Sequence, residues 1–183
     1  METIPPPPGA TLDRFRAAVE AAGSRYHELA GWDEVAALAA AGRGTVAVAP
    51  SLAAGAPSLL TALQAAGTPL VRSEGDDPAA AVADVDTGVV RGELGVAETG
   101  SVLVSEHAVE DRVVSMLCRR LVQVVARDAV VDRLDAVATW LSERAGQPGF
   151  VSLMTGPSRT ADIERTLTVG VQGPDAVEVV VLG

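Results

Sequence analysis

The sequence contains no lysine, because all fourteen of its basic residues are arginine. This excludes the lysine of a Walker A phosphate-binding loop and every mechanism that forms a Schiff base on lysine. Cys118 is the single cysteine, which excludes an internal disulfide and a four-cysteine iron–sulfur site. His27 and His107 are the only histidines and lie far apart, so a zinc site built mainly of His and Cys is also excluded. We therefore expect neither a metal site nor a bound cofactor in this chain.

The chain is also poor in aromatic residues and has no long apolar or basic run. Aromatics make up 3% of the sequence, which disfavours surfaces on which nucleic-acid bases stack. The net charge is −10 and no basic block could follow a phosphate backbone, so we expect no nucleic acid partner. No apolar run approaches the ~20 residues that cross a bilayer, and residues 1–8 lack the features of a secretory signal. These absences predict a cytoplasmic protein that does not insert into membranes.

The hydrophobic residues, 48% of the chain, are arranged in short alternating elements. Residues 1–10 include Pro5 to Pro8 and are expected to form a flexible arm, followed by one domain over residues 11–183. Apolar runs of strand length alternate with segments whose apolar residues recur at helical spacing. The predicted strands are 25–29, 45–49, 69–72, 94–97, 101–105, 121–126, 150–154 and 177–182, and the predicted helices are 11–22, 33–41, 58–66, 78–85, 130–145 and 161–169.

This alternation predicts an α/β fold. Strands that alternate with helices build a mostly parallel sheet covered by helices. The strands expected at 94–97 and 101–105 are separated only by a brief polar turn, so they should form an antiparallel hairpin. We expect 25–29 to be an edge strand.

Glu98, Thr99 and Gly100 occupy the turn of that hairpin. Gly100 adopts a positive φ at little cost, and Thr99 can satisfy local backbone groups, so turn chemistry alone favours a hairpin whose Glu98 points into water. In the functional interpretation, Glu98 lies at a sheet end inside a pocket and acts as an acid, a base or a nucleophile. Periodicity does not decide between the two.

The segment from Thr155 to Asp162 is predicted to join a strand to a helix. Gly156 lets a ligand approach the backbone, and Ser158 or Thr160 can cap the helix. Free backbone N–H groups together with Arg159 would suit a carboxylate or a phosphate. The alternative is that the hydroxyls and Asp162 only cap the helix.

Arg112 and Ser115 are three residues apart and share one face if this stretch is helical. They could form an anion clamp, but a surface pair of Arg112 with Glu110 or Glu106 is the simpler interpretation. Cys118 follows two apolar residues and is expected to be a buried small hydrophobic residue rather than a nucleophile.

Two segments together are distinctive. Residues 96–104 read Val-Ala-Glu-Thr-Gly-Ser-Val-Leu-Val, and residues 155–164 read Thr-Gly-Pro-Ser-Arg-Thr-Ala-Asp-Ile-Glu. They resemble the two signature stretches of the LUD-domain family, and the Arg112–Leu117 stretch, residues 170–174 and the apolar ending 179–182 also match. The chain departs from the family pattern at Cys118 to Leu121, where Pro-Pro-Val-His is usual, and at Gln172, where a histidine is common.

The resemblance implies a fold like that of the NagB/RpiA/CoA-transferase group. It also implies a role in bacterial oxidation of L-lactate to pyruvate beside two iron–sulfur partner proteins. A chain with one cysteine fits that arrangement, because electrons would travel through the partners. Carried over by position, the implied pocket comprises Glu98, Thr99, Gly100, Gly156, Ser158, Arg159 and Thr160.

Three hypotheses follow. In the first, the chain is a non-redox component of lactate oxidation that binds a small carboxylate or phosphorylated metabolite near Glu98 and Arg159. In the second, it is an independent isomerase or acyl-CoA transferase with Glu98 as base or nucleophile. In the third, it is a metabolite-sensing module without catalytic activity.

Overall fold

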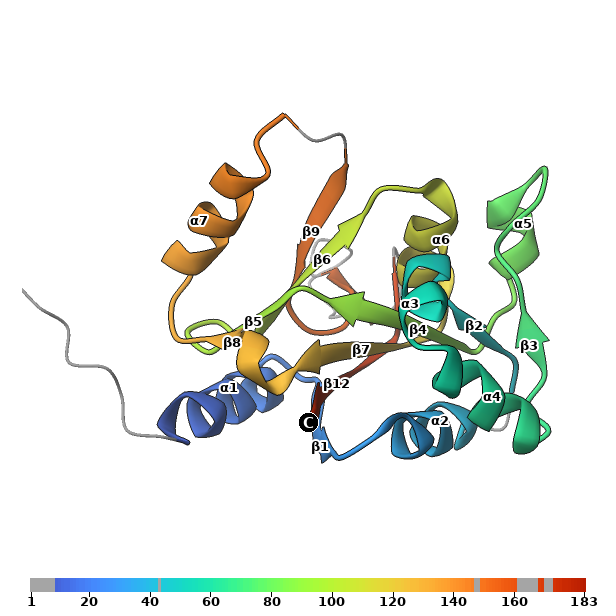
Figure 1. Ribbon diagram of the computed structural model, residues 1–183, viewed down its shortest axis with the longest axis horizontal. Coiled ribbons are helices and arrows are strands. Elements are labelled where there is room, and N and C mark those ends of the chain that lie inside the picture. Colours follow the sequence, from blue (N-terminus) through green and yellow to red (C-terminus); the bar gives the residue numbers. More distant parts are fainter. Residues whose placement is uncertain (1–8, 43, 147–148, 161–167, 170–172) are drawn as a thin grey trace, which may run out of the picture.

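The chain folds into two adjoining sheets covered by helices (Figure 1). The computed structural model describes residues 9–42, 44–146, 149–160, 168–169 and 173–183, and for 159, 160, 168 and 169 it describes the backbone only. The larger sheet has six strands in the order β1-β12-β7-β4-β2-β3, and every neighbouring pair is parallel. The smaller sheet has four strands in the order β8-β5-β6-β9. The predicted α/β fold with a mostly parallel sheet is therefore confirmed.

The elements have the following bounds. The six-stranded sheet comprises β1 (Arg25–Leu29), β2 (Val46–Val48), β3 (Leu70–Val71), β4 (Thr87–Gly92), β7 (Arg120–Ala126) and β12 (Ala176–Leu182). The four-stranded sheet comprises β5 (Leu94–Val96), β6 (Ser101–Glu106), β8 (Val130–Val131) and β9 (Phe150–Met154), and a short ladder joins β10 (Arg159–Thr160) to β11 (Thr168–Val169). The helices are α1 (Ala10–Ala21), α2 (Trp32–Ala40), α3 (Pro50–Gly55), α4 (Pro57–Ala65), α5 (Pro78–Val82), α6 (Val109–Leu117), η1 (Arg127–Ala129) and α7 (Asp135–Glu143). No helix in the described ranges is long and apolar enough to cross a membrane.

Strands β7 and β12 lie in the interior of the larger sheet and are buried along most of their length. Both are rich in valine, as strands covered on both faces usually are. Their parallel register pairs Val177 with Leu121 and Val179 with Gln123, which places these four side chains on one face. β1 lies at the edge of the sheet, as predicted.

Helices cover both faces of the larger sheet. α6 packs on β4 at Gly88, where a Cβ atom would lie 2.6 Å from the carbonyl oxygen of Val114. α1 lies on the same side, and Gly95 of β5 gives space to its Phe15 ring, because a Cβ atom there would lie 2.8 Å from that ring. α2 and α3 pack against β4 from the opposite side, and α4 packs on α2. Glycines thus set how closely α1 and α6 approach the sheets.

The smaller sheet contains the predicted hairpin. β5 and β6 pair antiparallel, β9 adds antiparallel to β6, and β8 adds parallel to β5. α7 lies outside this sheet, at the upper left of Figure 1. It is held by a small separate core of Val96, Leu103 and Val137, against which Trp140 packs.

Several elements, α6 among them, were not predicted from the sequence, and two of them show the physical reason. β4 lies inside the parallel sheet between β7 and β2, yet its glycines Gly88 and Gly92 interrupt the apolar pattern. At Gly92 a Cβ atom would lie 2.5 Å from both Val102 and Val125, so the glycine is required by close packing rather than by a turn. The second is α3, a short helix that begins with Pro50 at its first position.

Two predicted helices need correction. The helix expected over 130–145 begins only at Asp135, because Val130 and Val131 pair with β5 as strand β8. The helix expected over 161–169 is wrong at residues 168–169, which form β11, and residues 161–167 lie outside the described residues. Of the predicted arm, residues 1–8 also lie outside the described residues, and α1 already begins at Ala10.

Candidate functional site

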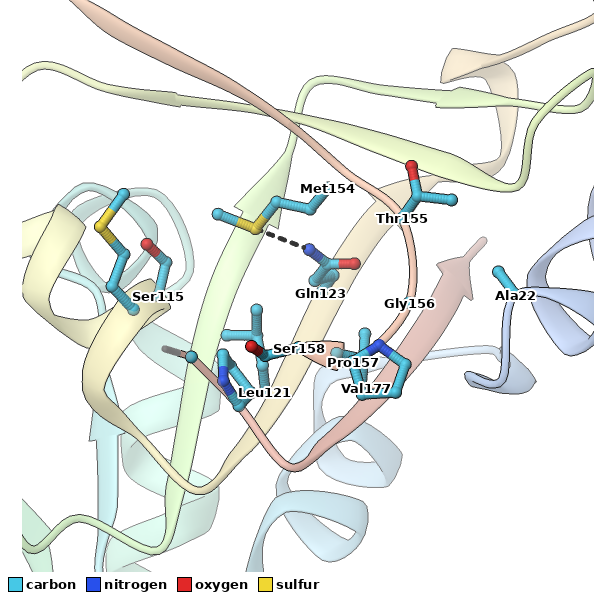
Figure 2. Close-up of a pocket in the computed structure, with 13 residues that line it drawn as sticks. Ala22, Ser115, Leu121, Gln123, Met154, Thr155, Gly156, Pro157, Ser158 and Val177 are labelled. Carbon is cyan, nitrogen blue, oxygen red and sulfur yellow. Dashed lines mark hydrogen bonds between the residues drawn. The ribbon is translucent and has the colours of Figure 1, made fainter. Parts of the chain in front are cut away.

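A cavity of about 640 Å³ lies on one face of the six-stranded sheet (Figure 2). Its size is typical of small-molecule sites, which span roughly 300–1,000 Å³. The end of α1, two residues of α6, the loop after β9 and the segment before β12 surround it. The described lining residues, none of them charged, are Ala22, Ser115, Met116, Leu121, Gln123, Met154, Thr155, Gly156, Pro157, Ser158, Gly173, Pro174 and Val177.

The floor of the cavity is built by β7 and β12. Leu121, Gln123 and Val177 reach it from the same sheet face, as their parallel register requires. Gln123 is 1% exposed, and its Nε2 donates to the Met154 sulfur at 3.1 Å. Gln123 was not predicted as a site residue. The sequence feature that could have indicated it is an amide side chain in the middle of a strand whose neighbouring residues are valine and leucine.

One wall is the loop after β9, which contains the predicted residues Gly156 and Ser158. Gly156 has φ 73°, and a Cβ atom there would lie 2.3 Å from the Ala22 carbonyl oxygen. Glycine therefore allows this loop to lie directly against the end of α1. The Ser158 backbone N–H donates to the Pro174 carbonyl at 3.0 Å, which joins the loop to the segment before β12. Both residues line the cavity, as expected of a ligand site.

Hydroxyl groups connect the hairpin turn to this wall. Thr99 Oγ1 lies 2.7 Å from Ser101 Oγ, which in turn lies 2.6 Å from Thr155 Oγ1. Gly100 has φ 70°, and a Cβ atom there would lie 2.5–2.6 Å from backbone atoms of Ala18 and from the Val19 nitrogen. The two distinctive sequence stretches therefore meet at Thr155, but Thr99 and Gly100 support the cavity without lining it.

Glu98 is placed differently from the functional interpretation. Its side chain is exposed and does not belong to the cavity lining. Its Oε2 accepts a hydrogen bond of 2.9 Å from the Leu134 backbone N–H, at the start of α7. A carboxylate there satisfies a free helix donor and complements the helix dipole. The geometry thus gives Glu98 a capping role and agrees with a hairpin turn, whose Gly100 N–H donates to the Val96 carbonyl at 2.8 Å.

Arg112 and Ser115 share α6 but do not form a clamp. Ser115 lines the cavity, and its hydroxyl donates to the Arg112 carbonyl at 2.9 Å. The Arg112 guanidinium instead lies 5.2 Å above the Phe150 ring, in a neighbouring apolar groove. No ion pair joins Arg112 to Glu106 or Glu110 in the described structure, so the expected surface pair is not observed.

The side chains of the remaining predicted residues, Arg159 and Thr160, lie outside what the structure describes. Their backbone pairs antiparallel with Val169 and Thr168 as strand β10. The helix start expected at residue 161 lies outside the described residues. β10 begins directly after Ser158, so its backbone leaves from the wall of the cavity.

Two buried groups near this region have shifted pKa values. Glu106 is 2% exposed, and neither of its carboxylate oxygens has a hydrogen-bond partner in the described structure. Burial raises the pKa of Glu106, and the Asp111 carboxylate adds to the rise, whereas Ser115 and Arg112 oppose it. Burial raises the pKa of the Cys118 thiol to about 12, so it stays protonated and unreactive, as its predicted burial implied. No cluster of three His, Cys, Asp or Glu side chains suited to a metal occurs among the described residues.

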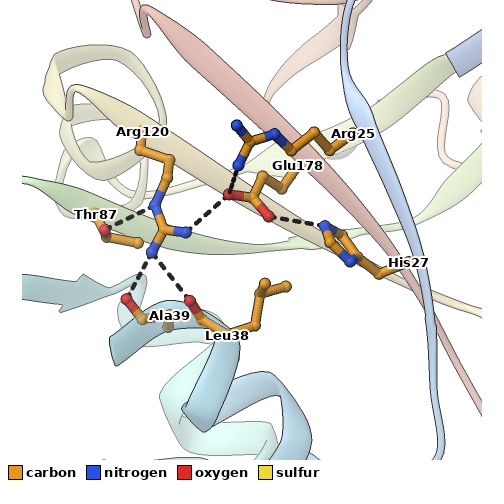
Figure 3. A network of polar contacts seen from close by, with 7 residues as sticks. All are labelled: Arg25, His27, Leu38, Ala39, Thr87, Arg120 and Glu178. Carbon is orange, nitrogen blue, oxygen red and sulfur yellow. Dashed lines mark hydrogen bonds and ion pairs between the residues drawn. The ribbon is translucent and has the colours of Figure 1, made fainter. Parts of the chain in front are cut away.

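A second polar cluster surrounds Glu178 on the other face of the larger sheet (Figure 3). Glu178 is 2% exposed, and its two oxygens accept from Arg120 and from His27 Nε2, each at 2.8 Å. Arg25 approaches to 3.9 Å but is largely exposed. The carboxylate is thus buried together with its partners, and His27 occupies the edge strand as predicted.

Arg120 also connects the sheet to α2. Its guanidinium donates to the carbonyls of Leu38 and Ala39 at 3.1 and 2.6 Å and to Thr87 Oγ1 at 3.2 Å. These carbonyls belong to the last turn of α2, where helix carbonyls have few intrahelical partners; that of Leu38 also accepts from the Ala41 N–H at 3.3 Å. Because Arg120 and Glu178 satisfy each other and the helix end, we assign this cluster to stability rather than to ligand binding.

Comparison with known proteins shows which family the chain matches. The LUD domain family matches residues 12–182. "Lactate utilization protein C" of Geobacillus thermodenitrificans is 32% identical over 98 residues, which cover 51% of this chain and 41% of that protein. The protein of the same name from Shouchella clausii is 33% identical over 92 residues, covering 49% of this chain and 40% of that protein. The matched region thus spans only about two fifths of these relatives' length.

A solved structure shares the fold. The crystal structure of a DUF162 family protein from Deinococcus radiodurans superposes with a TM-score of 0.73 at 17% sequence identity, covering 98% of this chain and 100% of that one. The family match extends over nearly the whole described fold and includes both stretches that meet at Thr155. This chain belongs to the LUD domain family.

Proposed function

We propose that this protein is a non-redox component of L-lactate utilisation that acts with iron–sulfur partner proteins and binds a small anionic metabolite in the cavity beside β7. The observation that carries the proposal is the meeting of the two family stretches at this cavity, through the hydroxyls of Thr99, Ser101 and Thr155. The names of the relatives supply the pathway.

The charge of the ligand is argued from the position of Arg159. The described cavity lining has no charged side chain, so a carboxylate or phosphate buried there would need a cation. Ser158 lies on the cavity wall, and Arg159 follows it directly in the sequence. We therefore assign the anionic group of the ligand to the Ser158–Arg159 end of the cavity and its neutral remainder to the floor.

The redox step is assigned to partners because of the chemistry of the one thiol. Cys118 is 2% exposed and burial raises its pKa to about 12, so the free thiol stays protonated near neutral pH and does not attack a substrate. As the single cysteine of the sequence it does not supply the four thiolates of an iron–sulfur cluster. An independent enzyme with Glu98 as base or nucleophile has less support, because Glu98 is bound to the start of α7 outside the cavity.

The test fills the cavity without touching the core. Ser158→Trp should place an indole in the cavity, whereas Ser58→Trp makes the same exchange on an exposed position of α4 that lines no cavity described here. Each variant replaces the chromosomal gene in the native host, and growth on L-lactate is compared with growth on glucose.

We expect the gene deletion and Ser158→Trp to impair growth on L-lactate alone, and Ser58→Trp to grow normally. Equal amounts of folded protein should be verified in each strain. Normal growth of the deletion strain on L-lactate, without a second copy of the gene, would refute the pathway assignment. Normal growth of Ser158→Trp would refute the role of the cavity. Binding of a metabolite by a protein dispensable for growth on lactate would favour the sensor hypothesis.

A further inference from the structure

Gln123 has hydrogen-bonding capacity that the described part of the protein does not use. It lies at the centre of the cavity floor in Figure 2, and Leu121, its neighbour on the same face of β7, is apolar. Its Nε2 donates to the Met154 thioether, which is a weak acceptor. Its Oε1 has no hydrogen-bond partner in the described structure.

This arrangement is costly for the fold alone. A buried amide without good partners destabilises a protein relative to an apolar side chain of the same shape. Gln123 is paired with Val90 of β4 on one side and with Val179 of β12 on the other, and both valines are apolar and buried. Leucine at position 123 would continue this surface. Among the described residues the amide therefore has only Met154 as a structural partner, and its remaining hydrogen-bonding capacity faces the cavity.

The chemistry around Gln123 selects a neutral partner. The described lining around Gln123 has no cation, so a carboxylate against the amide would be buried unfavourably, and the Ser158–Arg159 end remains the place for the anionic group. An amide side chain offers one acceptor and one donor side by side, and it is complementary to a group that offers the same pair in reverse. Met154 lies against Gln123 and Met116 also lines the cavity, and the thioethers of both are polarisable groups that make favourable contacts with flat π-systems.

The size of the cavity also indicates a ligand larger than lactate. A volume of 640 Å³ corresponds to about twenty molecules of liquid water. Lactate has only a few non-hydrogen atoms and would leave most of this space to solvent. A ligand that fills the cavity has a further, uncharged part.

We propose that Gln123 recognises a neutral amide-type edge, a carbonyl beside an N–H, on the uncharged part of the cavity's ligand. Gln123 Nε2 donates to the ligand carbonyl and Oε1 accepts from the ligand N–H. The edge belongs either to a flat ring lactam or to an open-chain primary amide, because a trans secondary amide directs its carbonyl and its N–H to opposite sides. The inference rests on the proposed function only in using the same cavity.

The test uses Gln123→Leu, with Gln64→Leu on the exposed surface of α4 as the matched control. Thermal unfolding comes first. We expect Gln123→Leu to unfold at the same or a higher temperature than the wild type, because a poorly partnered buried amide is removed. A clearly lower unfolding temperature would show that Gln123 is structural and would overturn the inference.

Calorimetric titration then uses three probes: uracil for the ring lactam, acetamide for the open-chain primary amide, and L-lactate. We expect uracil or acetamide to bind the wild type and Gln64→Leu, and the affinity for Gln123→Leu to fall by roughly tenfold or more, since two neutral hydrogen bonds are lost. The better of the two probes identifies the source of the edge. Equal binding to Gln123→Leu, or binding of L-lactate alone, would overturn the proposal.

Failure of this inference is distinguishable from failure of the proposed function. If Gln123→Leu supports normal growth on L-lactate while Ser158→Trp does not, the cavity is required and Gln123 recognition is wrong. If Ser158→Trp grows normally while amide probes bind through Gln123, the pathway role of the cavity is wrong and the binding site remains.

Discussion

Replacing Arg120 by methionine removes one cation that serves two parts of the fold. Methionine keeps an unbranched apolar stem of similar reach and loses every donor. Glu178, only 2% exposed, then loses its 2.8 Å ion pair and keeps His27 as its close partner. The Leu38 and Ala39 carbonyls at the end of α2 lose their shared donor in the same step.

The expected loss follows from the burial of Glu178. Breaking a buried ion pair by removing one partner costs about 3–5 kcal/mol, because the remaining charge is left in a poorly hydrated site. In a chain of this size each kcal/mol shifts the melting temperature by about 2–4 °C, so Arg120→Met should melt roughly 6–20 °C below the wild type. Arg25 lies 3.9 Å from the same carboxylate but is 80% exposed. Arg25→Met should therefore cost less than about 1 kcal/mol.

Urea unfolding followed by circular dichroism measures both variants and the double variant Arg120→Met/Glu178→Leu. The double variant should recover part of the stability lost in Arg120→Met, because the unpaired carboxylate is gone. A loss below about 1 kcal/mol for Arg120→Met would refute the reasoning, since surface pairs lie in that range. A double variant less stable than Arg120→Met would show that Glu178 has a structural role independent of Arg120.

Two further substitutions test the packing and the buried charge near the cavity. Gly100→Ala should lower the free energy of unfolding in urea by more than about 2 kcal/mol, because the added Cβ would meet the α1 backbone. Gly67→Ala is the control: Gly67 has φ 68° and open space around it, so this variant should lose only the ~1–2 kcal/mol of the left-handed conformation. Equal losses in the two variants would refute the close approach of Gly100 to α1. Glu106→Gln should raise the free energy of unfolding by about 1 kcal/mol at pH 7. Burial raises the pKa of Glu106 in the folded state above its unfolded value, so the carboxyl destabilises the fold at pH values above the unfolded-state pKa, and the gain should shrink towards pH 4.5. A pH-independent difference in melting temperature would contradict this assignment.

Much of the fold and part of the candidate site could be predicted from the sequence. The strands at 25–29 and 150–154 have the predicted bounds, and the hairpin of β5 and β6 was expected from two apolar runs around a short polar turn. Gly156 and Ser158 were predicted to face a ligand and do line the cavity. These features depend on local periodicity and turn chemistry, which a single segment carries by itself.

Only the tertiary structure decided the rest. β4 is an interior strand whose glycines make room for α6 and β6, so its pattern makes sense only beside its neighbours. Glu98 caps α7, an element more than thirty residues later in the chain. Gln123 became a candidate because β12, α6 and the β9 loop enclose the space above it. Sequence patterns record which face of an element is apolar, whereas the partner of a polar side chain is set by segments that meet only when the sheets form.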